Sequence, residues 1–152
     1  MAQNSRTNLS NVAVKYMQLL KLPVTKTTLK NNLEENPYYP SLYSLSTVFS
    51  RLKIDNQAFE IDSENLQQFT PPFIAYLNVP ANGKDFVLVT KITNTTVNYI
   101  AEGSKTKTIS KENFLKGFQK IVFVAEGTAQ SGEKAYAENL QKEKKLENKM
   151  QP

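Results

Sequence analysis

Asp85 and Glu102 are the two residues of this sequence whose type and placement come nearest to a reactive pair. Asp85 precedes the apolar run 86–89 and Glu102 follows the strand-like segment 97–101, so adjacent strands could bring the carboxyl groups together. Paired carboxylates can hydrolyse glycosides or help to hold a hard cation. We favour solvated acids, because strand-end carboxylates are usually exposed and two are too few for a cation cage. We therefore expect no metal site.

Cysteine and histidine are both absent from the 152 residues. Their absence excludes disulfides, thiolate metal sites and thiol nucleophiles, and it removes the usual general base. Without histidine a serine triad is not available, and no serine lies in a glycine-flanked elbow. No glycine-rich phosphate loop is present either. The sequence therefore predicts a protein that is not a Cys- or His-dependent enzyme, and it predicts no cofactor.

Three tyrosines flank a loop bounded by prolines, namely Tyr38, Tyr39 and Tyr43. Exposed aromatic side chains at such a loop would suit peptide binding. The interpretation that we favour is packing of these rings against the sheet and the second helix, since large apolar side chains are rarely left exposed in groups.

The net charge is +5, and the excess lies in residues 1–125, which hold 14 Lys or Arg and 9 Asp or Glu. These basic residues are scattered rather than clustered with aromatics, so we expect a solubilising surface and no nucleic-acid partner. The start of the chain lacks an apolar core of a signal peptide, and no apolar run could cross a bilayer. The polypeptide is expected to be soluble by itself and not to insert into a membrane, while still being compatible with a soluble part of a membrane protein.

The apolar periodicity predicts three helices followed by strands. The first helix spans 9–20 and ends before Pro23, the second is capped by Thr25 or Thr27, and the third begins at the N-cap Ser41 and ends near residue 53. Strand-like segments and short helical turns follow, with the central run 86–89 apolar throughout, as expected for a strand covered on both faces. This order predicts an α+β fold, with three N-terminal helices packed on a mostly antiparallel sheet of about five strands.

The last part of the chain differs in composition. The tail begins at Gly127, residues 130–132 are linker-like, and 133–149 are rich in Glu, Lys, Ala and Leu with few apolar residues for a core face. We therefore predict a folded domain over residues 1–126 and a charged, helical linker or tail over 127–152.

Three strings resemble the papain-like leader peptidases that cleave after double-glycine motifs and form the N-terminal domain of bacterial peptide-exporting ABC transporters. They are VAVKYMQLLKLPV (12–24), SLYSLSTVFSRLKI (41–54) and PFIAYLNVPANGKDFVLV (72–89). The resemblance covers about residues 3–125 and implies a papain-like cysteine peptidase fold. The stretch NPYYPSL (36–42) is similar to a degenerate form of that domain, found ahead of transmembrane helices of the vitamin K epoxide reductase type in Bacteroidetes-type proteins.

At each position where the family has its catalytic Cys, His or Asp, this sequence has a different residue type. The nucleophilic Cys would fall at Asn8 or Leu9, the His at Asp85, and the orienting Asp at Ala101 or Glu102. Gln3 could match the oxyanion-hole Gln, but an oxyanion donor without a nucleophile catalyses nothing useful. The resemblance thus implies a pseudo-peptidase, not an enzyme.

From these observations we expect a non-catalytic peptidase-like domain that binds a peptide or unfolded segment. It would be the recruitment or regulatory module of a larger membrane protein, an exporter or thiol-redox fusion, at the cytoplasmic face of the inner membrane. Its partners would be that peptide and its own downstream transmembrane domain, and the candidate contact residues are Tyr38, Tyr39, Tyr43 and Asp85. The alternative is an intramolecular docking domain with no free ligand. A carboxylate-dependent hydrolase is the least favoured function.

Overall fold

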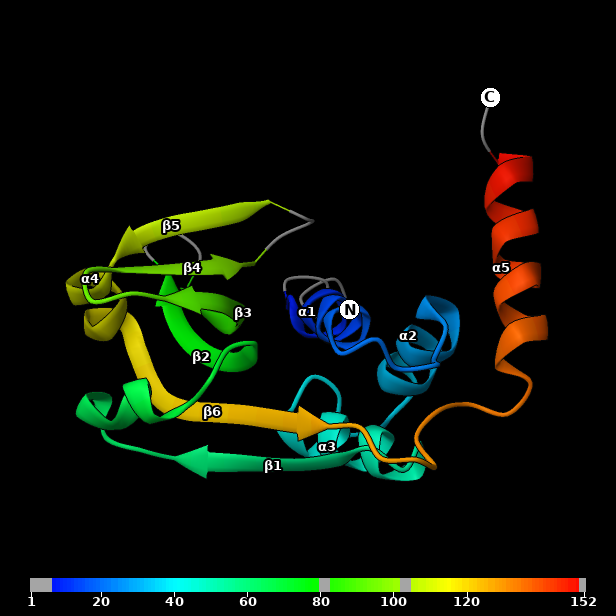
Figure 1. Ribbon diagram of the computed structural model, residues 1–152, viewed down its shortest axis with the longest axis horizontal. Coiled ribbons are helices and arrows are strands. Elements are labelled where there is room, and N and C mark those ends of the chain that lie inside the picture. Colours follow the sequence, from blue (N-terminus) through cyan, green and yellow to red (C-terminus); the bar gives the residue numbers. More distant parts are fainter. Residues whose placement is uncertain (1–6, 80–82, 102–104, 151–152) are drawn as a thin grey trace.

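The computed structural model describes residues 7–79, 83–101 and 105–150, and it places the helices and strands in separate parts of the molecule (Figure 1). Three helices come first, and strands follow with short helices between them. The elements are α1 (Leu9–Leu19), α2 (Lys26–Glu34), α3 (Leu42–Arg51), β1 (Asp55–Glu60), η2 (Ser63–Gln68), β2 (Phe73–Val79), β3 (Gly83–Ile92), β4 (Thr96–Ile100), β5 (Thr106–Ser110), α4 (Lys111–Gly117), β6 (Phe118–Glu126) and α5 (Tyr136–Met150).

Side-chain caps fix the starts of α2, α3 and α4. The hydroxyl oxygens of Thr25, Ser41 and Ser110 each accept a hydrogen bond from the backbone N–H three residues on, at 3.0–3.2 Å. These bonds satisfy backbone donors that have no partner within the helix. The prediction of Ser41 as the cap of the third helix is confirmed, and of the two threonines proposed for the second helix, Thr25 is the cap.

The sheet is antiparallel throughout the described residues, in the order β1-β6-β2-β3-β4-β5. The α+β fold class is confirmed, with six strands in place of about five. Strands β2 and β3 occupy the centre, where Ala75 faces Val87 and Leu77 faces Asp85 across the ladder. The apolar run predicted to be covered on both faces lies here, and Val87, Leu88 and Val89 are fully buried.

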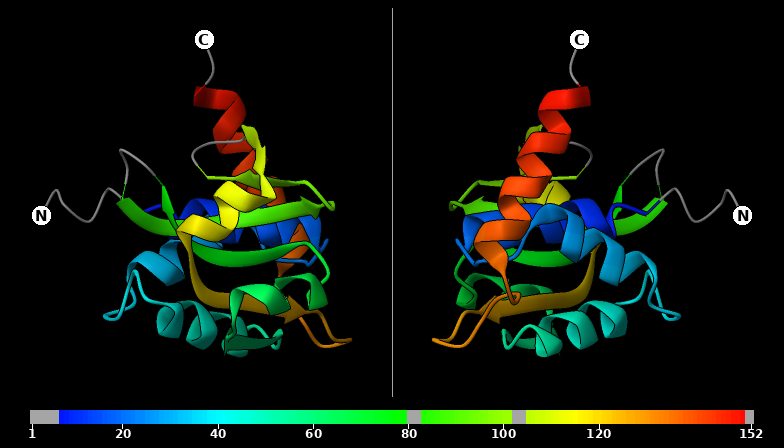
Figure 2. Two further views of the ribbon diagram at one scale, coloured as in Figure 1. Left: turned by 90° about the vertical axis from the view of Figure 1, so that its left-hand side faces the viewer. Right: turned by 90° about the vertical axis from the view of Figure 1, so that its right-hand side faces the viewer.

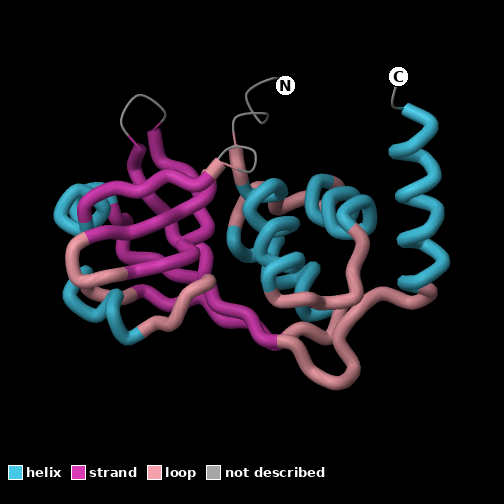
Figure 3. The backbone as a smooth tube through the Cα atoms, turned by 45° about the horizontal axis from the view of Figure 1, so that its top comes forward, coloured by secondary structure: helices cyan, strands magenta, loops and turns pink. Residues whose placement is uncertain are grey.

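Alternate residues of the central strands pack into two separate cores, one on each face of the sheet. On one face Ile74, Leu88 and Phe123 meet α1, α2 and α3. On the other face Phe73, Ala75 and Val87 pack with Leu66 from η2 and Phe114 from α4, among others. Figure 3 shows the helices α1–α3 grouped beside the magenta sheet. The layered arrangement places the start of α1 against β3, which is where the candidate site lies.

The last helix, α5, stands at the edge of the molecule, beyond α2 (Figure 1). Its residues belong to neither apolar core. Across the described part of the chain, none of the helices is both long and apolar enough to cross a membrane.

Candidate functional site

The start of α1 is closed by a carboxylate from β3. The backbone N–H of Asn8 donates to both oxygens of Asp85, at 3.0 Å to Oδ1 and 2.9 Å to Oδ2. The hydroxyl of Thr7 donates to Oδ1 at 3.3 Å, and the N–H of Phe86 donates to the same atom at 2.8 Å. Asp85 therefore accepts hydrogen bonds from two segments that are 77 residues apart in sequence.

This contact replaces a cap that α1 does not have within its own sequence. The side chain of Asn8, at the N-cap position, accepts no capping hydrogen bond, whereas Thr7 Oγ1 accepts one from the N–H of Leu9 at 3.1 Å. The negative charge of Asp85 lies where the partial positive charge of the helix is concentrated, so the arrangement is electrostatically favourable. The carboxylate ties the first helix to the centre of the sheet.

Two of the other positions that correspond to catalytic residues of the resembled family, Leu9 and Ala101, hold apolar side chains. Leu9 is fully buried in the core between helices and sheet. Ala101 is buried in the core on the opposite face. Gln3 and Glu102 lie outside the described residues, so the expected proximity of Asp85 and Glu102 stays a prediction. Across the described residues no group of three acidic side chains could hold a metal ion.

The described groups at this point are a carboxylate, one hydroxyl and backbone N–H groups. Asp85 is a fixed anion whose oxygens already accept from backbone and hydroxyl donors. The hydroxyl of Thr7 donates to this carboxylate at 3.3 Å and accepts from the N–H of Leu9, but a carboxylate is a weak base for a hydroxyl because the ordinary pKa of Asp is about 4. The described residues at the start of α1 thus form a structural contact rather than a nucleophile–base pair.

Two of the three candidate tyrosines are exposed on the surface. Tyr38 is 60% exposed and Tyr43 is 64% exposed, and their rings meet edge to face with centroids 5.0 Å apart. Tyr39, between them in the loop, is half-buried and packs against the core under α1–α3. Packing, the interpretation favoured from sequence, therefore holds for Tyr39 and is wrong for Tyr38, in the loop, and for Tyr43, in the first turn of α3, since both rings are exposed.

Hydrogen bonds within the loop hold this aromatic pair in place. Asn36 accepts from the N–H of Tyr38 through its side chain, at 2.9 Å, and from the N–H of Tyr39 through its carbonyl, at 3.0 Å. The carbonyl of Tyr38 accepts from the N–H of Ser41, the N-cap residue of α3, at 2.9 Å. In both views of Figure 2 the loop between α2 and α3 lies at the same end of the molecule as the start of α1.

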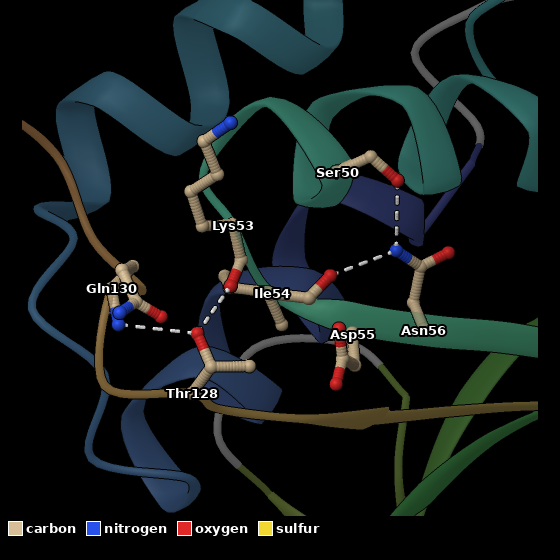
Figure 4. A pocket seen from close by; sticks show the side chains of 7 residues that line it. All are labelled: Ser50, Lys53, Ile54, Asp55, Asn56, Thr128 and Gln130. Carbon is tan, nitrogen blue, oxygen red and sulfur yellow. Dashed lines mark hydrogen bonds between the residues drawn. The ribbon is translucent and has the colours of Figure 1, made fainter.

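A separate shallow pocket of about 570 Å³ lies where α3 passes into β1. Figure 4 shows that its polar groups bond to one another: Asn56 donates to Ser50 and to the carbonyl of Ile54, and Thr128 donates to the carbonyl of Lys53. Since these groups satisfy each other, the pocket is best explained as the point where the chain leaving β6 is fastened to the domain. Sequence reasoning missed it, because its two sides are 75 residues apart.

Three helices on one face of an antiparallel sheet, with the first helix starting against a central strand, define a papain-like domain. The sequence model of the peptidase C39 family matches residues 3–130, and the chain belongs to that family. The resemblance to double-glycine leader peptidase domains noted in the sequence is thereby confirmed.

Solved structures agree with this fold. The peptidase domain of ComA, a bifunctional ABC transporter from Streptococcus, is 13% identical, with a TM-score of 0.67 over 82% of this chain and 93% of that one. A double glycine motif protease from an AMS/PCAT transporter, solved with its leader peptide, is 13% identical, with a TM-score of 0.70 over 81% and 86%. The peptidase C39-like domain of a toxin secretion ATP-binding protein from Vibrio parahaemolyticus is 16% identical, with a TM-score of 0.64 over 80% and 98%.

None of the curated protein sequences compared with this chain matches it. At identities of 13–16% the structural likeness defines the fold and carries no information on activity. What this member of the family does must be argued from its own residues.

Proposed function

We propose that this domain binds a peptide or an unfolded segment without cutting it. The observation that carries the proposal is at the start of α1, where the carboxylate of Asp85 holds the backbone of Asn8 at 2.9 and 3.0 Å. A thiol peptidase needs a nucleophile and a base within hydrogen-bond reach of each other. This chain has no thiol or imidazole for such a pair, and the carboxylate of Asp85 accepts from a backbone N–H at the start of the helix.

Binding is supported by the exposed aromatic pair. Tyr38 lies in a loop that is held by its own hydrogen bonds, and Tyr43 lies in the first turn of α3, so little backbone entropy is lost when a ligand contacts the two rings. Exposed tyrosines are frequent anchors in interfaces because they offer a large apolar area and a polar tip. The solved relative that holds a leader peptide indicates that the fold can take such a ligand.

We further propose that the domain serves as a recruitment or regulatory module at the cytoplasmic face of a larger membrane protein, an exporter or a thiol-redox fusion. Relatives from ABC transporters support this setting. The reading frame tests it: an apolar stretch of about 20 residues downstream is expected. A gene that stops at Pro152 would contradict it.

A direct test measures fluorescence anisotropy of labelled double-glycine leader peptides titrated with the full chain. We expect saturable binding in the micromolar range. Replacing both tyrosines (Tyr38→Ala with Tyr43→Ala) should weaken binding about thirtyfold, since each aromatic anchor contributes on the order of 1 kcal/mol. Leu146→Ala is the matched control, because Leu146 is 60% exposed but lies on α5. No saturation by a correctly folded domain would contradict peptide binding.

Cleavage is tested with the same peptides by mass spectrometry. We expect no product after prolonged incubation with the unchanged chain. Peptide turnover that is abolished by Asp85→Ala would show that the carboxylate is catalytic and would overturn the non-enzymatic part of the proposal.

The alternative function, an intramolecular docking domain without a free ligand, is favoured by a different observation. The segment after β6 is bonded to the body at several points, including Thr128 and Ser131 to the carbonyl of Lys53. Binding of no peptide, together with loss of stability when this segment is removed, would select that alternative.

A further inference from the structure

Glu133 joins the segment after β6 to the first turn of α2. Its carboxylate accepts from the backbone N–H of Thr25 and from the hydroxyl of Thr28, the latter at 2.9 Å. Asn139, in the first turn of α5, donates to the same carboxylate at 2.8 Å. One side chain therefore links the tail, the start of α2 and the start of α5.

Two more glutamates from α5 reach the same turn. Glu143 accepts from the backbone N–H of Thr27 at 2.7 Å, and Glu147 forms an ion pair with Lys26 at 2.7 Å. The pKa of Lys26 is raised, chiefly by its hydrogen bond to Glu147, which is consistent with a real attraction at this partly exposed position. Three carboxylates thus face the positive end of α2, where negative charge is stabilising.

The residues that lead to α5 are fixed as well. The N–H of Gly132 donates to the carbonyl of Leu52 at 2.8 Å, and the N–H of Glu133 donates to the carbonyl of Pro23 at 3.0 Å. Gly132 has a φ of +130°, and a Cβ there would lie 2.5 Å from Pro23 Cγ, so glycine is required. The direction in which the chain leaves the domain is therefore set by the body of the domain.

Apolar contact contributes little to this docking. Tyr136 and Leu140 are half-buried beside Leu22, whereas Leu146 is 60% exposed. A groove of about 490 Å³ remains between α5 and the turn from α1 to α2. A helix of 15 residues is marginal alone in water, so α5 depends on its docking for order.

We propose that residues 133–150 are a charge-held latch on the first turn of α2, which opens when its carboxylates are screened or neutralised while the rest of the domain stays folded. The latch is independent of the proposed peptide binding. An open latch would free the direction in which the chain continues after α5.

Hydrogen exchange on the full chain, followed by mass spectrometry, tests the latch. Raising NaCl from 0.05 to 1 M shortens the screening length to about 3 Å. We expect exchange of the α5 amides to rise about tenfold, because contacts of this kind each contribute a modest factor. The amides of β2 and β3 should not change, which shows that the body remains folded.

Two variants separate the latch from the intrinsic stability of the helix. Glu147 lies in the last turn of α5, where the helix dipole disfavours it, and Glu143 at the middle of the helix is a like charge four residues before it. An isolated helix would therefore gain order from Glu143→Gln with Glu147→Gln. The control, Glu138→Gln, removes a favourable first-turn acid, which is exposed and lies about half a turn round the helix from Glu147. For an isolated helix, the double variant would exchange its amides more slowly than Glu138→Gln. The latch predicts the reverse: the α5 amides of the double variant should exchange about tenfold faster than those of wild type, and faster than those of Glu138→Gln.

The latch is overturned by either of two results. One is exchange of the α5 amides that does not respond to salt. The other is a double variant that exchanges no faster than Glu138→Gln.

Discussion

The starts of α1 and α2 are both closed by carboxylates from distant parts of the chain, but the carboxylates come from different places. Asp85, which closes α1, belongs to a central strand that is paired on both sides. Glu133 and Glu143, which close α2, follow the last strand and lie beyond residues 3–130, the part that matches the family. The first contact thus lies within the part of the chain that matches the family, whereas the second is added by the tail.

The two helices also differ in whether their own N-cap residue caps them. Thr25 caps α2 with its own hydroxyl, so the glutamates add to an end that is already partly satisfied. The N-cap residue of α1, Asn8, provides no such bond, so Asp85 is the main acceptor there. Removing an acceptor at the start of α1 should therefore lower the free energy of unfolding more than removing one at the start of α2. The predictions below test that order.

The largest effect is expected from Asp85→Ala. The variant leaves the N–H of Asn8 and the hydroxyl of Thr7 without their acceptor and removes the charge at the helix start. We expect the free energy of unfolding to fall by about 2–3 kcal/mol. Urea denaturation should show a lower midpoint with an unchanged slope.

Asp62→Ala is the matched control for this prediction. Asp62 is also an aspartate at the start of a helix, as the N-cap residue of η2, but its side chain makes no capping hydrogen bond and is exposed. Its replacement should change stability by less than about 0.5 kcal/mol. Equal effects of the two variants would mean that the contact of Asp85 with α1 contributes nothing specific.

A second anchor of α1 predicts a dependence on alkaline pH. Tyr16 is buried, and the backbone N–H of Ala125, in β6, donates to its phenol oxygen at 2.8 Å. Burial raises the pKa of Tyr16 to about 12, against a lowering by that hydrogen bond. Because the neutral phenol is favoured in the folded state, its contribution is complete below pH 10, the ordinary pKa, and is lost as pH rises towards 12.

The loss through Tyr16 should be on the order of 2 kcal/mol between pH 10 and pH 12. Other groups titrate in the same range, so the measurement is the difference in unfolding free energy between wild type and Tyr16→Phe across these pH values. The difference should shrink as pH rises. A difference that is constant with pH would contradict the shifted pKa.

The elements and the family were predictable from sequence because they depend on local patterns. The first helix was expected over 9–20 and spans Leu9–Leu19, since its apolar spacing is regular and Pro23 follows. Ser41 was identified as a cap because its side chain bonds to a donor only three residues away. The same holds for the central strands, whose apolar runs are long.

The contacts that define the two helix starts could not be predicted in this way. The sequence identified Asp85 as the position of the family's catalytic His. Its hydrogen-bond partners, Thr7 and Asn8, are 78 and 77 residues away, and only the packing of α1 against β3 brings them together. The docking of the tail was missed for a related reason. Its apolar residues are too few to indicate a packed face, and the contacts of Glu133 and Glu143 with α2 span more than 100 residues.

The smallest effect is expected from Thr25→Ala, which removes the internal cap of α2 and leaves the tail carboxylates in place. Stability should fall by about 1 kcal/mol, less than for Asp85→Ala, because the variant loses the capping bond from Thr28 and a long hydrogen bond to Glu133 at 3.4 Å, while Glu133 keeps its bonds from the N–H of Thr25 and the hydroxyl of Thr28. Thr25→Ser should restore most of it, since serine keeps the accepting oxygen. Thr27→Ala is the control: Thr27 is exposed and contributes its backbone N–H, which alanine retains. If Thr25→Ala cost as much as Asp85→Ala, the two helix starts would be equally dependent on a single acceptor, and the contrast between a contact within the part that matches the family and one added by the tail would fail.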